Sequence, residues 1–294
     1  MLPLTIANKF TPEIQVCSGT VKSSNASDSR CISINFDNSN PQWKQTVSMP
    51  VGRLMTDCVL LPDGTILYTN GIQRGQAGGV AGKADGGNGI TSPELSAHIF
   101  DPKTKQYSQV ASSTVPRLYH SGAVLLVDGR VLTMGSEMQN YVDVKANRRD
   151  CMPFVEISCT QPFENRMEAF EPPYLSLPNT RPVISKVVSN LTYKSVFKVN
   201  VSTEASEIDS VSFIRYSTTT HSTNTDQRFV ELVILGKESN AIYVEAPDNG
   251  NIAPPGNWML FLLSKGKPSV AATILLGEGE VVKVEVPVEA KKAA

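Results

Sequence analysis

The side chains best suited to metal chemistry are one tyrosine and two of the three histidines. Tyr119 and His120 are adjacent, and His221 lies 101 residues further along the chain. Two imidazoles with a phenol oxygen form a donor set typical of Cu(II). Neighbouring residues of a regular strand point to opposite faces, so Tyr119 and His120 can converge on one metal only at the start of a strand or at a bend. The preceding Pro116 favours such a bend.

The sequence around the histidines leaves other interpretations open. His221 lies in a polar stretch, residues 218–228, which joins two apolar strands and has the composition of a solvent-exposed hairpin tip. His98 lies within the apolar run 95–100 and is expected to be an ordinary, partly buried side chain. Two histidines so far apart in sequence do not define a site by themselves.

The cysteines argue against two common kinds of site. They are Cys17, Cys31, Cys58, Cys151 and Cys159. None forms a C-x-x-C motif, which argues against a zinc ribbon and a thioredoxin-like redox site. Cys17 with Cys31, and Cys151 with Cys159, are close enough in sequence to close small loops. Whether either pair forms a disulfide is left open, and Cys58 would be the unpaired thiol.

Signals for cellular location disagree. Three N-glycosylation sequons, at Asn25, Asn190 and Asn200, favour an extracytoplasmic protein. Residues 1–7 lack the basic region of a signal peptide, and Asn8-Lys9 ends their apolar run early. The chain thus has features of a secreted protein, and we expect no signal peptide in it.

Composition excludes several classes of protein. Lys and Arg number 27 against 28 Asp and Glu, and this balance argues against a nucleic-acid partner, since such proteins usually carry a basic stripe. No run of about 18 apolar residues is present, so we expect no membrane span. The motifs G-x-S-x-G and H-E-x-x-H and the EF-hand loop are also missing from the sequence. Hydrolase and zinc-protease functions therefore gain little support.

The elements expected to position these residues begin with a repeat. Phe36-Asp37, Trp43 and Arg53 are matched 64 residues later by Phe100-Asp101, Tyr107 and Arg117. Each arginine is followed by two apolar runs around an Asp-Gly pair, at Asp63-Gly64 and Asp128-Gly129, which is a strong β-hairpin signal. A period of this length built on strand–turn–strand units is typical of propeller blades. Two unrelated hairpins in one sandwich are the alternative.

The pattern of apolar and turn-forming residues changes at Pro172-Pro173 and Arg181-Pro182. Beyond this point short apolar runs alternate with turn residues, at 183–188, 196–201, 211–216, 230–235, 242–246, 258–263 and 272–276. Seven short strands in about 110 residues predict an immunoglobulin-like sandwich. We therefore expect an all-β chain, with a partial propeller in residues 1–178 and a sandwich in residues 179–294.

Several motifs together resemble glyoxal oxidase, a copper-radical oxidase of the group that also contains galactose oxidase. They lie at 117–121, 125–131, 135–137, 170–175, 181–182, 220–228 and 253–261. The Tyr119-His120 pair and the Thr-His-x-x-Asn-Thr-Asp-Gln-Arg motif at 220–228 are specific, and the resemblance covers almost the whole chain in order. The stretch 135–138 and the Cys151–Cys159 insert resemble fungal members more than plant ones.

The resemblance implies a fold and a reaction. The fold would be the last two to three blades of a kelch-type propeller, followed by an immunoglobulin-like early-set domain whose hairpin enters the propeller hub. Tyr119 would be the axial copper ligand and the catalytic base, and His120 and His221 the two copper-binding histidines. The reaction would be the two-electron oxidation of a small aldehyde or alcohol by O2, with release of hydrogen peroxide, outside the cell.

One part of the family pattern has no match in this sequence. The family's second tyrosine ligand is cross-linked to a cysteine and holds the radical, and Cys58 and Tyr68 sit in later-blade positions that do not correspond to it. We therefore expect the cysteine–tyrosine radical cofactor to be absent, copper binding to be weak or lost, and turnover to be missing. Open blade edges also predict self-association. The alternative is a non-catalytic module that binds protein or cell-wall glycan.

Overall fold

Strands make up nearly all of the regular structure. The computed structural model describes residues 1–20, 27–37, 39–74, 91–136, 142–143, 148–149 and 164–291. Helical elements within these ranges are two 3₁₀ turns, η1 (Pro173–Ser176) and η2 (Ala205–Glu207), and the short helix α1 (Val288–Lys291). The all-β prediction is confirmed. No helix in the described ranges has the length and apolar character needed to cross a membrane.

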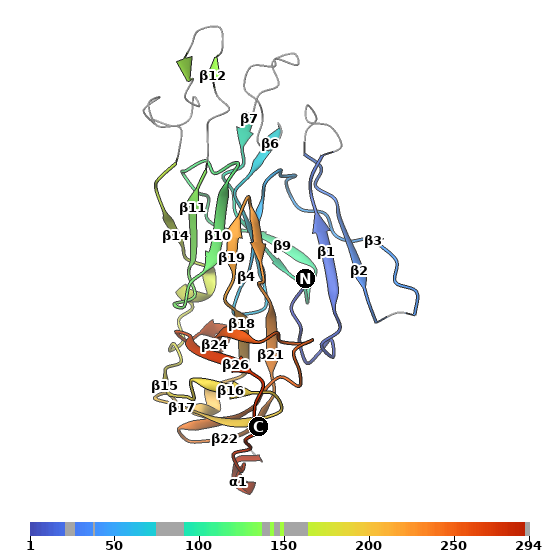
Figure 1. Ribbon diagram of the computed structural model, residues 1–294. Helices are drawn as coiled ribbons and strands as arrows, with labels where there is room; N and C mark the ends of the chain where they lie inside the picture. Colours follow the sequence, from blue (N-terminus) through green and yellow to red (C-terminus); the bar gives the residue numbers. More distant parts are fainter. Residues whose placement is uncertain are drawn as a thin grey trace.

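Three antiparallel sheets follow one another along the first 170 residues (Figure 1). Their strands are β1 (Glu13–Cys17), β2 (Cys31–Asn35) and β3 (Lys44–Gln45); β4 (Asp57–Leu60), β5 (Ile66–Thr69), β8 (His98–Asp101) and β9 (Gln106–Gln109); and β10 (Ser121–Leu125), β11 (Val131–Gly135) and β14 (Glu168–Phe170). Two short pairs accompany them, β6 (Ile72–Arg74) with β7 (Thr91–Pro93) and β12 (Val142–Asp143) with β13 (Arg148–Arg149). Strands pair in chain order within each sheet, as in propeller blades, so the prediction of two to three blades is confirmed.

The two Asp-Gly turns close their hairpins in the same way. Asp63 Oδ1 accepts a hydrogen bond from the backbone N–H of Thr65, and Asp128 Oδ1 accepts one from that of Arg130, both at 3.0 Å. The glycine of each turn has a positive φ, +82° at Gly64 and +86° at Gly129, a conformation that glycine adopts without steric cost. The two Asp-Gly pairs that predicted hairpins in the sequence therefore form the tight turns expected of them.

The repeated arginines hold each blade together from inside. Both side chains are fully buried. Arg53 donates to the carbonyl oxygens of Asn70 and Ser96, at 3.0 and 2.5 Å. Arg117 donates to those of Gly135 and Arg166, at 2.8 and 2.9 Å. Burial lowers the pKa of Arg53 to about 10, so this guanidinium still carries its charge at neutral pH.

Two further sheets pack face to face below the blades and form the sandwich. One has the order β15 (Ile184–Lys186), β17 (Val196–Val201), β23 (Ala241–Glu245) and β22 (Ile234–Glu238). The other has the order β16 (Asn190–Thr192), β26 (Ala272–Gly277), β24 (Gly256–Ser264), β18 (Ser210–Arg215) and β21 (Phe229–Leu232), with β25 (Lys267–Pro268) paired to β24. The rings of Phe213 and Trp258 stack between them, with centroids 4.7 Å apart.

One predicted strand of the sandwich is in fact two. The apolar run 230–235 divides into β21, which pairs with β18, and β22, which pairs with β23 in the opposite sheet. The chain changes sheets at Val233, whose carbonyl accepts a hydrogen bond from Glu245. The apolar residues of the run give no sign of this change, because hydrophobicity does not report which sheet a strand joins.

The sandwich and the blades share an apolar core. Along β24, Trp258, Leu260 and Leu262 belong to the sandwich core. The alternate residues Met259, Phe261 and Leu263 pack with the blade residues. Side chains of a strand alternate between faces, so β24 is buried on both sides. The expected boundary at residues 178–179 thus separates the two parts only along the chain. In space the two parts pack against each other through a continuous apolar contact.

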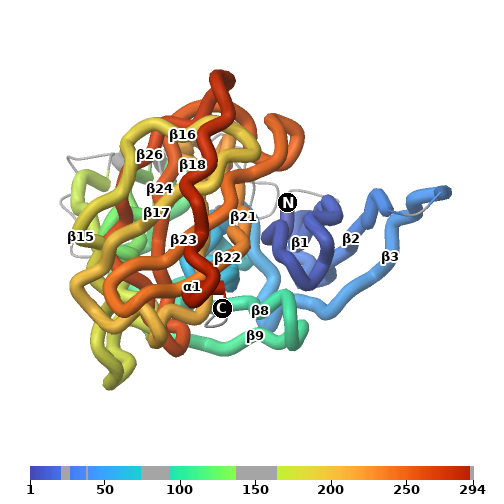
Figure 2. The backbone as a smooth tube through the Cα atoms, turned by 90° about the horizontal axis from the view of Figure 1, so that it is seen from below, coloured from blue at the N-terminus to red at the C-terminus, as the bar shows by residue number. Residues whose placement is uncertain are grey.

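The N-terminal segment also belongs to the sandwich. Leu4 lies parallel to Val230 at the edge of β21, and its backbone exchanges hydrogen bonds with Phe229 and Glu231. Its side chain is 2% exposed and lies in the sandwich core. Figure 2 shows this N-terminus beside β21, with the sheet β1–β2–β3 projecting to one side.

Candidate metal centre

Tyr119, His120 and His221 lie together although two separate segments supply them. The rings of Tyr119 and His120 stack with centroids 3.8 Å apart. His221 meets both rings edge-on, with centroids 4.3 Å from His120 and 5.5 Å from Tyr119. Tyr119 is half-buried and both histidines are exposed. The three predicted site residues thus form one cluster that is open to solvent.

A tight turn before β10 brings the two adjacent residues to one side. The backbone N–H of Ser121 bonds to the carbonyl of Leu118, and His120 has a φ of +60°. This left-handed conformation reverses the alternation of a regular strand. The bend predicted from the sequence is present. Leu118 anchors the turn, since its side chain is buried and its N–H donates to Ser136 Oγ at 2.8 Å.

The other histidine sits at the tip of a hairpin from the sandwich. The hairpin consists of β19 (Thr218–Thr220) and β20 (Thr223–Thr225), and its two turn residues, His221 and Ser222, both have positive φ, +54° and +57°. Positive φ at both positions is the mark of a type I′ turn. His221 Nδ1 hydrogen-bonds with Thr220 Oγ1 at 2.7 Å, which leaves Nε2 as the nitrogen available to a metal.

Backbone and side-chain contacts seat this hairpin against β10. The N–H of Ser222 donates to the carbonyl of Ser121 at 3.0 Å, and Asn224 Nδ2 donates to that of Ala123 at 3.1 Å. Gly122 makes the close approach possible, because a Cβ there would lie 2.6 Å from Thr219 Cγ2. In Figure 1 the hairpin rises from the sandwich between β10 and β4.

The hairpin is also fixed at its base, against β4. Gln227 accepts a hydrogen bond from the N–H of Leu60 at 3.0 Å and donates one to the carbonyl of Cys58 at 2.8 Å. The amide side chain thus pairs with one backbone donor and one backbone acceptor of β4, as a neighbouring strand would. The polar motif at 220–228 therefore contains docking residues as well as a candidate ligand.

Asp57 is a buried carboxylate next to this cluster that sequence reasoning missed. Its side chain is 0% exposed, and its Oδ2 accepts hydrogen bonds from Asn70 Nδ2 at 2.8 Å and Ser121 Oγ at 3.1 Å. Burial raises the pKa of Asp57 to about 6, which its hydrogen bonds partly offset. The signal available in the sequence was an acidic residue directly before the apolar run Cys58–Leu61.

The remaining chemical candidates lie elsewhere. His98 is buried, and its Nδ1 accepts from Arg53 Nη2 at 3.0 Å, so it is a core residue of the second blade. Cys17 and Cys31 form a disulfide, which confirms that pairing, and Cys58 is a free thiol. Cys151 and Cys159 lie outside the described residues. Within the described ranges no group of three or more His, Cys, Asp and Glu side chains lies close enough together to hold a metal ion, so a metal site formed from these four residue types alone is not seen there.

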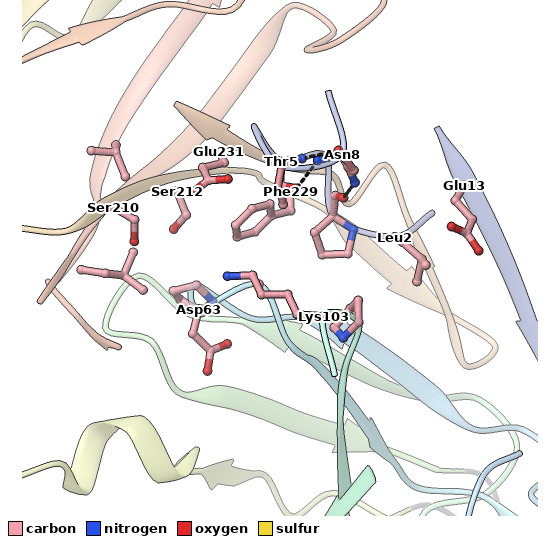
Figure 3. Close-up of a pocket in the computed structure, with 17 residues that line it drawn as sticks. Leu2, Thr5, Asn8, Glu13, Asp63, Lys103, Ser210, Ser212, Phe229 and Glu231 are labelled. Carbon is pink, nitrogen blue, oxygen red and sulfur yellow. Dashed lines mark hydrogen bonds between the residues drawn. The ribbon is translucent and has the colours of Figure 1, made fainter. Parts of the chain in front are cut away.

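A cavity of about 280 Å³ lies apart from the cluster (Figure 3). It opens between the N-terminal segment, the Asp63-Gly64 turn and strands β18 and β21, and Phe229, Glu231 and Lys103 are among the residues that line it. The turn that closes β4–β5 is at the opposite end of β4 from Asp57, and none of the three candidate ligands lines the cavity. The cavity is therefore separate from the candidate ligands on the hairpin tip and on the turn before β10.

Comparison with known proteins decides the family. The family described as "Glyoxal oxidase N-terminus" matches residues 1–174, and "Galactose oxidase-like, Early set domain" matches residues 181–276. The chain belongs to the glyoxal oxidase family. Because these matches join the blades to the sandwich in the order predicted, the resemblance seen in the motifs is confirmed.

Relatives come from plants and fungi. Identity is 33% over 260 residues with "Aldehyde oxidase GLOX1" of Arabidopsis thaliana, covering 83% of this chain and 39% of the relative. It is 34% over 249 residues with "Aldehyde oxidase GLOX" of Vitis pseudoreticulata, covering 81% and 43%. It is 33% over 221 residues with "Galactose oxidase" of Gibberella zeae, covering 74% and 28%. The chain therefore spans less than half the length of these relatives.

A solved structure supports the fold. A fungal alcohol oxidase in complex with copper superposes with a TM-score of 0.69 at 24% identity, covering 90% of this chain and 51% of that one. At this identity the superposition shows a shared arrangement of blades and sandwich.

Proposed function

We propose that Tyr119, His120 and His221 bind copper, and that this chain is the copper-binding part of an oxidase acting on small aldehydes or alcohols with O2. The observation that carries the proposal is the convergence of the three rings, within 5.5 Å of one another between centroids, from segments 101 residues apart. Membership of the glyoxal oxidase family supports the choice of metal and of substrate class.

The donor set fits Cu(II). Two imidazoles and one phenol give nitrogen and oxygen ligands, which suit a tetragonal copper site, and the described part of the cluster includes no thiolate that would favour zinc. The hydrogen bond from His221 Nδ1 to Thr220 fixes the orientation of one imidazole. Exposure of both histidines leaves the site open to a small substrate.

The residues themselves carry specific tasks in the proposed reaction. Two electrons and two protons leave the alcohol or hydrated aldehyde, and O2 takes up both to become hydrogen peroxide. Bound copper would supply a redox centre for these electrons. Tyr119, half-buried and bound to the metal as a phenolate, would accept the proton of the substrate hydroxyl at Oη. His120 and His221 orient the site.

We further propose that the chain does not turn over by itself. The sequence contains no match to the cross-linked cysteine and tyrosine of the family, and two-electron chemistry needs a second redox group besides copper. Cys58 and Tyr68 face each other across β4 and β5. The Tyr68 phenol, however, donates to Gln15 of β1 at 3.3 Å and lies 3.9 Å from Cys17 Sγ, so it is engaged with the first blade.

Two measurements on the purified chain test this proposal. Metal analysis at equilibrium with free Cu(II) should give about one weakly bound copper per chain, and the double variant His120→Ala/His221→Ala should bind none, whereas His98→Gln should behave as the wild type. Peroxide should not form from methylglyoxal or galactose. Copper retained by the double variant contradicts the ligand assignment, and peroxide formation contradicts the inactivity.

The proposed location is extracellular. The Cys17–Cys31 disulfide supports it, because disulfides persist in oxidising compartments. Mass spectrometry of the protein from its natural source should find this bond oxidised and the sequons at Asn190 and Asn200 glycosylated. A reduced pair without glycans would contradict the proposal.

A second copy of the chain is proposed as a partner of the first blade. One face of sheet β1–β2–β3 packs on the next blade through Cys17, Cys31 and Tyr107. The other face is apolar and open, with Val16 50% and Ile32 39% exposed where they pair across the strands. Light scattering should detect oligomers that the variant Val16→Thr/Ile32→Thr reduces and the control Val288→Thr does not. A monodisperse wild-type monomer would rule this out.

A further inference from the structure

Asp57 is an unusual residue to find at the start of a buried strand. It is the first residue of β4, it pairs with Thr69 of β5, and its carboxylate is fully buried. Oδ2 accepts two hydrogen bonds, and the backbone N–H of Ala123 in β10 also stabilises the charged carboxylate. Burying a carboxylate is costly even with such partners, which points to a role other than stability.

The carboxylate is linked to both halves of the candidate copper site. Ser121 Oγ donates to Asp57 Oδ2, and Ser222 Oγ lies 3.3 Å from Ser121 Oγ. Since Ser121 uses its only proton on the carboxylate, Ser222 must be the donor of the second bond. Ser121 directly follows His120, and Ser222 directly follows His221. The chain of hydrogen bonds therefore runs from one ligand segment, through the other, to Asp57.

We propose that Asp57 is a positioning residue for copper, whose carboxylate orders the Ser121–Ser222 hydrogen bond and thereby fixes the two histidines relative to each other. This inference rests on the proposed copper site. Both histidines have a positive φ, +60° at His120 and +54° at His221, a conformation that is uncommon for residues other than glycine. The side-chain hydrogen bond between Ser121 and Ser222, directly after the two histidines, joins the two turns beside the backbone bond from the Ser222 N–H to the Ser121 carbonyl.

The contacts that dock the hairpin as a whole are separate from this link. Four hydrogen bonds remain if the carboxylate is removed. They run from the Ser222 N–H to the Ser121 carbonyl, from Asn224 to Ala123, and between Gln227 and the backbone of Leu60 and Cys58. Loss of Asp57 should therefore leave the hairpin docked and alter the orientation of its tip. Burial also makes the charged carboxyl unfavourable, so removing the charge should not reduce stability at neutral pH.

The test measures copper binding and stability in the same proteins. Asp57→Ala removes the acceptor, Asp57→Asn keeps one acceptor oxygen without the charge, and Ser222→Ala removes the last link. Ser212→Ala is the matched control, because Ser212 is a buried serine of β18 whose hydroxyl has no hydrogen-bond partner in the described ranges. Cu(II) affinity is measured by competition with a chelator, the copper environment by electron paramagnetic resonance, and stability by urea unfolding.

The dissociation constant for Cu(II) should rise about tenfold or more in Asp57→Ala, as for other residues that orient metal ligands. Its resonance spectrum should become heterogeneous, and Asp57→Asn should fall between it and the wild type. Adding Ser222→Ala to Asp57→Ala should cause little further loss, because both act through one link. Ser212→Ala should bind as the wild type does.

The outcomes separate this inference from the proposed function. A wild-type chain that binds no copper overturns the copper site, and with it this role for Asp57. A wild-type chain that binds copper, with Asp57→Ala binding equally well and giving the same spectrum, overturns the positioning role alone. That role is also overturned if the losses in Asp57→Ala and Ser222→Ala add fully, or if weaker binding only follows a general loss of stability at the working temperature.

Discussion

The starts of β4 and β10 occupy the same place in two successive blades, yet only one of them carries the candidate copper ligands. Arg53 and Arg117 are 64 residues apart, whereas the glycines of the two Asp-Gly turns are 65 apart. One residue has therefore been added between them. The pair Asp57–Thr69 corresponds in register to Gly122–Met134, which places the addition before β10, at Tyr119.

The added residue changes what the same turn can do. Met55 before β4 and His120 before β10 both have a positive φ, +58° and +60°, so the turn itself belongs to the blade repeat. At β10 the extra residue sets a phenol beside an imidazole. Two positions further on, Asp57 supplies a carboxylate and the matching Gly122 supplies space for Thr219. The blade repeat with one inserted residue thus provides both a docking surface for the hairpin and a pair of adjacent candidate ligands.

Deletion of Tyr119 should have the largest effect, because it makes the start of β10 equal in length to that of β4. The shortened turn keeps the blade but loses the phenol and moves His120. Cu(II) affinity should fall more than about 100-fold, with an unchanged far-UV circular dichroism spectrum. Tyr119→Phe is the control, since it removes only the oxygen and should weaken binding less. Equal copper binding by the deletion variant and the wild type would contradict the idea that the inserted residue creates the site.

The arginines should show that the two blades are otherwise alike. Arg53→Met and Arg117→Met each leave buried carbonyl groups without a donor, and each should lower the free energy of unfolding by about 4 kcal/mol. Urea unfolding measures both. Two values within about 1 kcal/mol of each other support a common frame, whereas one near zero would show that the blades are held in different ways.

Asp57 should make stability depend on pH. Its pKa is about 6 in the folded chain against a reference value of 3.8, so the folded state binds more protons between these values. The free energy of unfolding therefore falls as pH rises from 4 to 7, by about 2 kcal/mol from this group. The difference between wild type and Asp57→Asn should shift by that amount across the range, and the difference for Ser212→Ala should stay constant. A shift of the opposite sign would refute the burial effect.

Gly122→Ala should have the smallest effect of the four. Its new Cβ meets Thr219 Cγ2 at 2.6 Å, and the hairpin must move by a few tenths of an ångström, at a cost of about 1 to 2 kcal/mol. Thermal unfolding measures the loss, and Thr219→Ala in the same chain should restore part of it. Gly277→Ala, where nothing lies within 4 Å, is the control. Equal stabilities of the two alanine variants would contradict the close packing of hairpin and blade.

The sequence predicted the architecture better than the details of the site. Strand periodicity and Asp-Gly turns were enough for the blades and most of the sandwich, and Tyr119, His120 and His221 were predicted to converge from a motif resemblance. The division of residues 230–235 between two sheets was missed, because hydrophobicity does not report which sheet a strand joins. Asp57 was missed because its importance depends on Ser121, which is 64 residues away in sequence and adjacent only in the fold.

Pulsed electron paramagnetic resonance of the Cu(II)-loaded chain counts the imidazoles bound to the metal and so tests the proposed copper site. We expect two imidazoles in the wild type and one in either His120→Ala or His221→Ala, with two again in His98→Gln. A wild-type spectrum without imidazole coupling, or one that neither alanine variant changes, would contradict the assignment of the hairpin tip and the β10 turn as a single copper site.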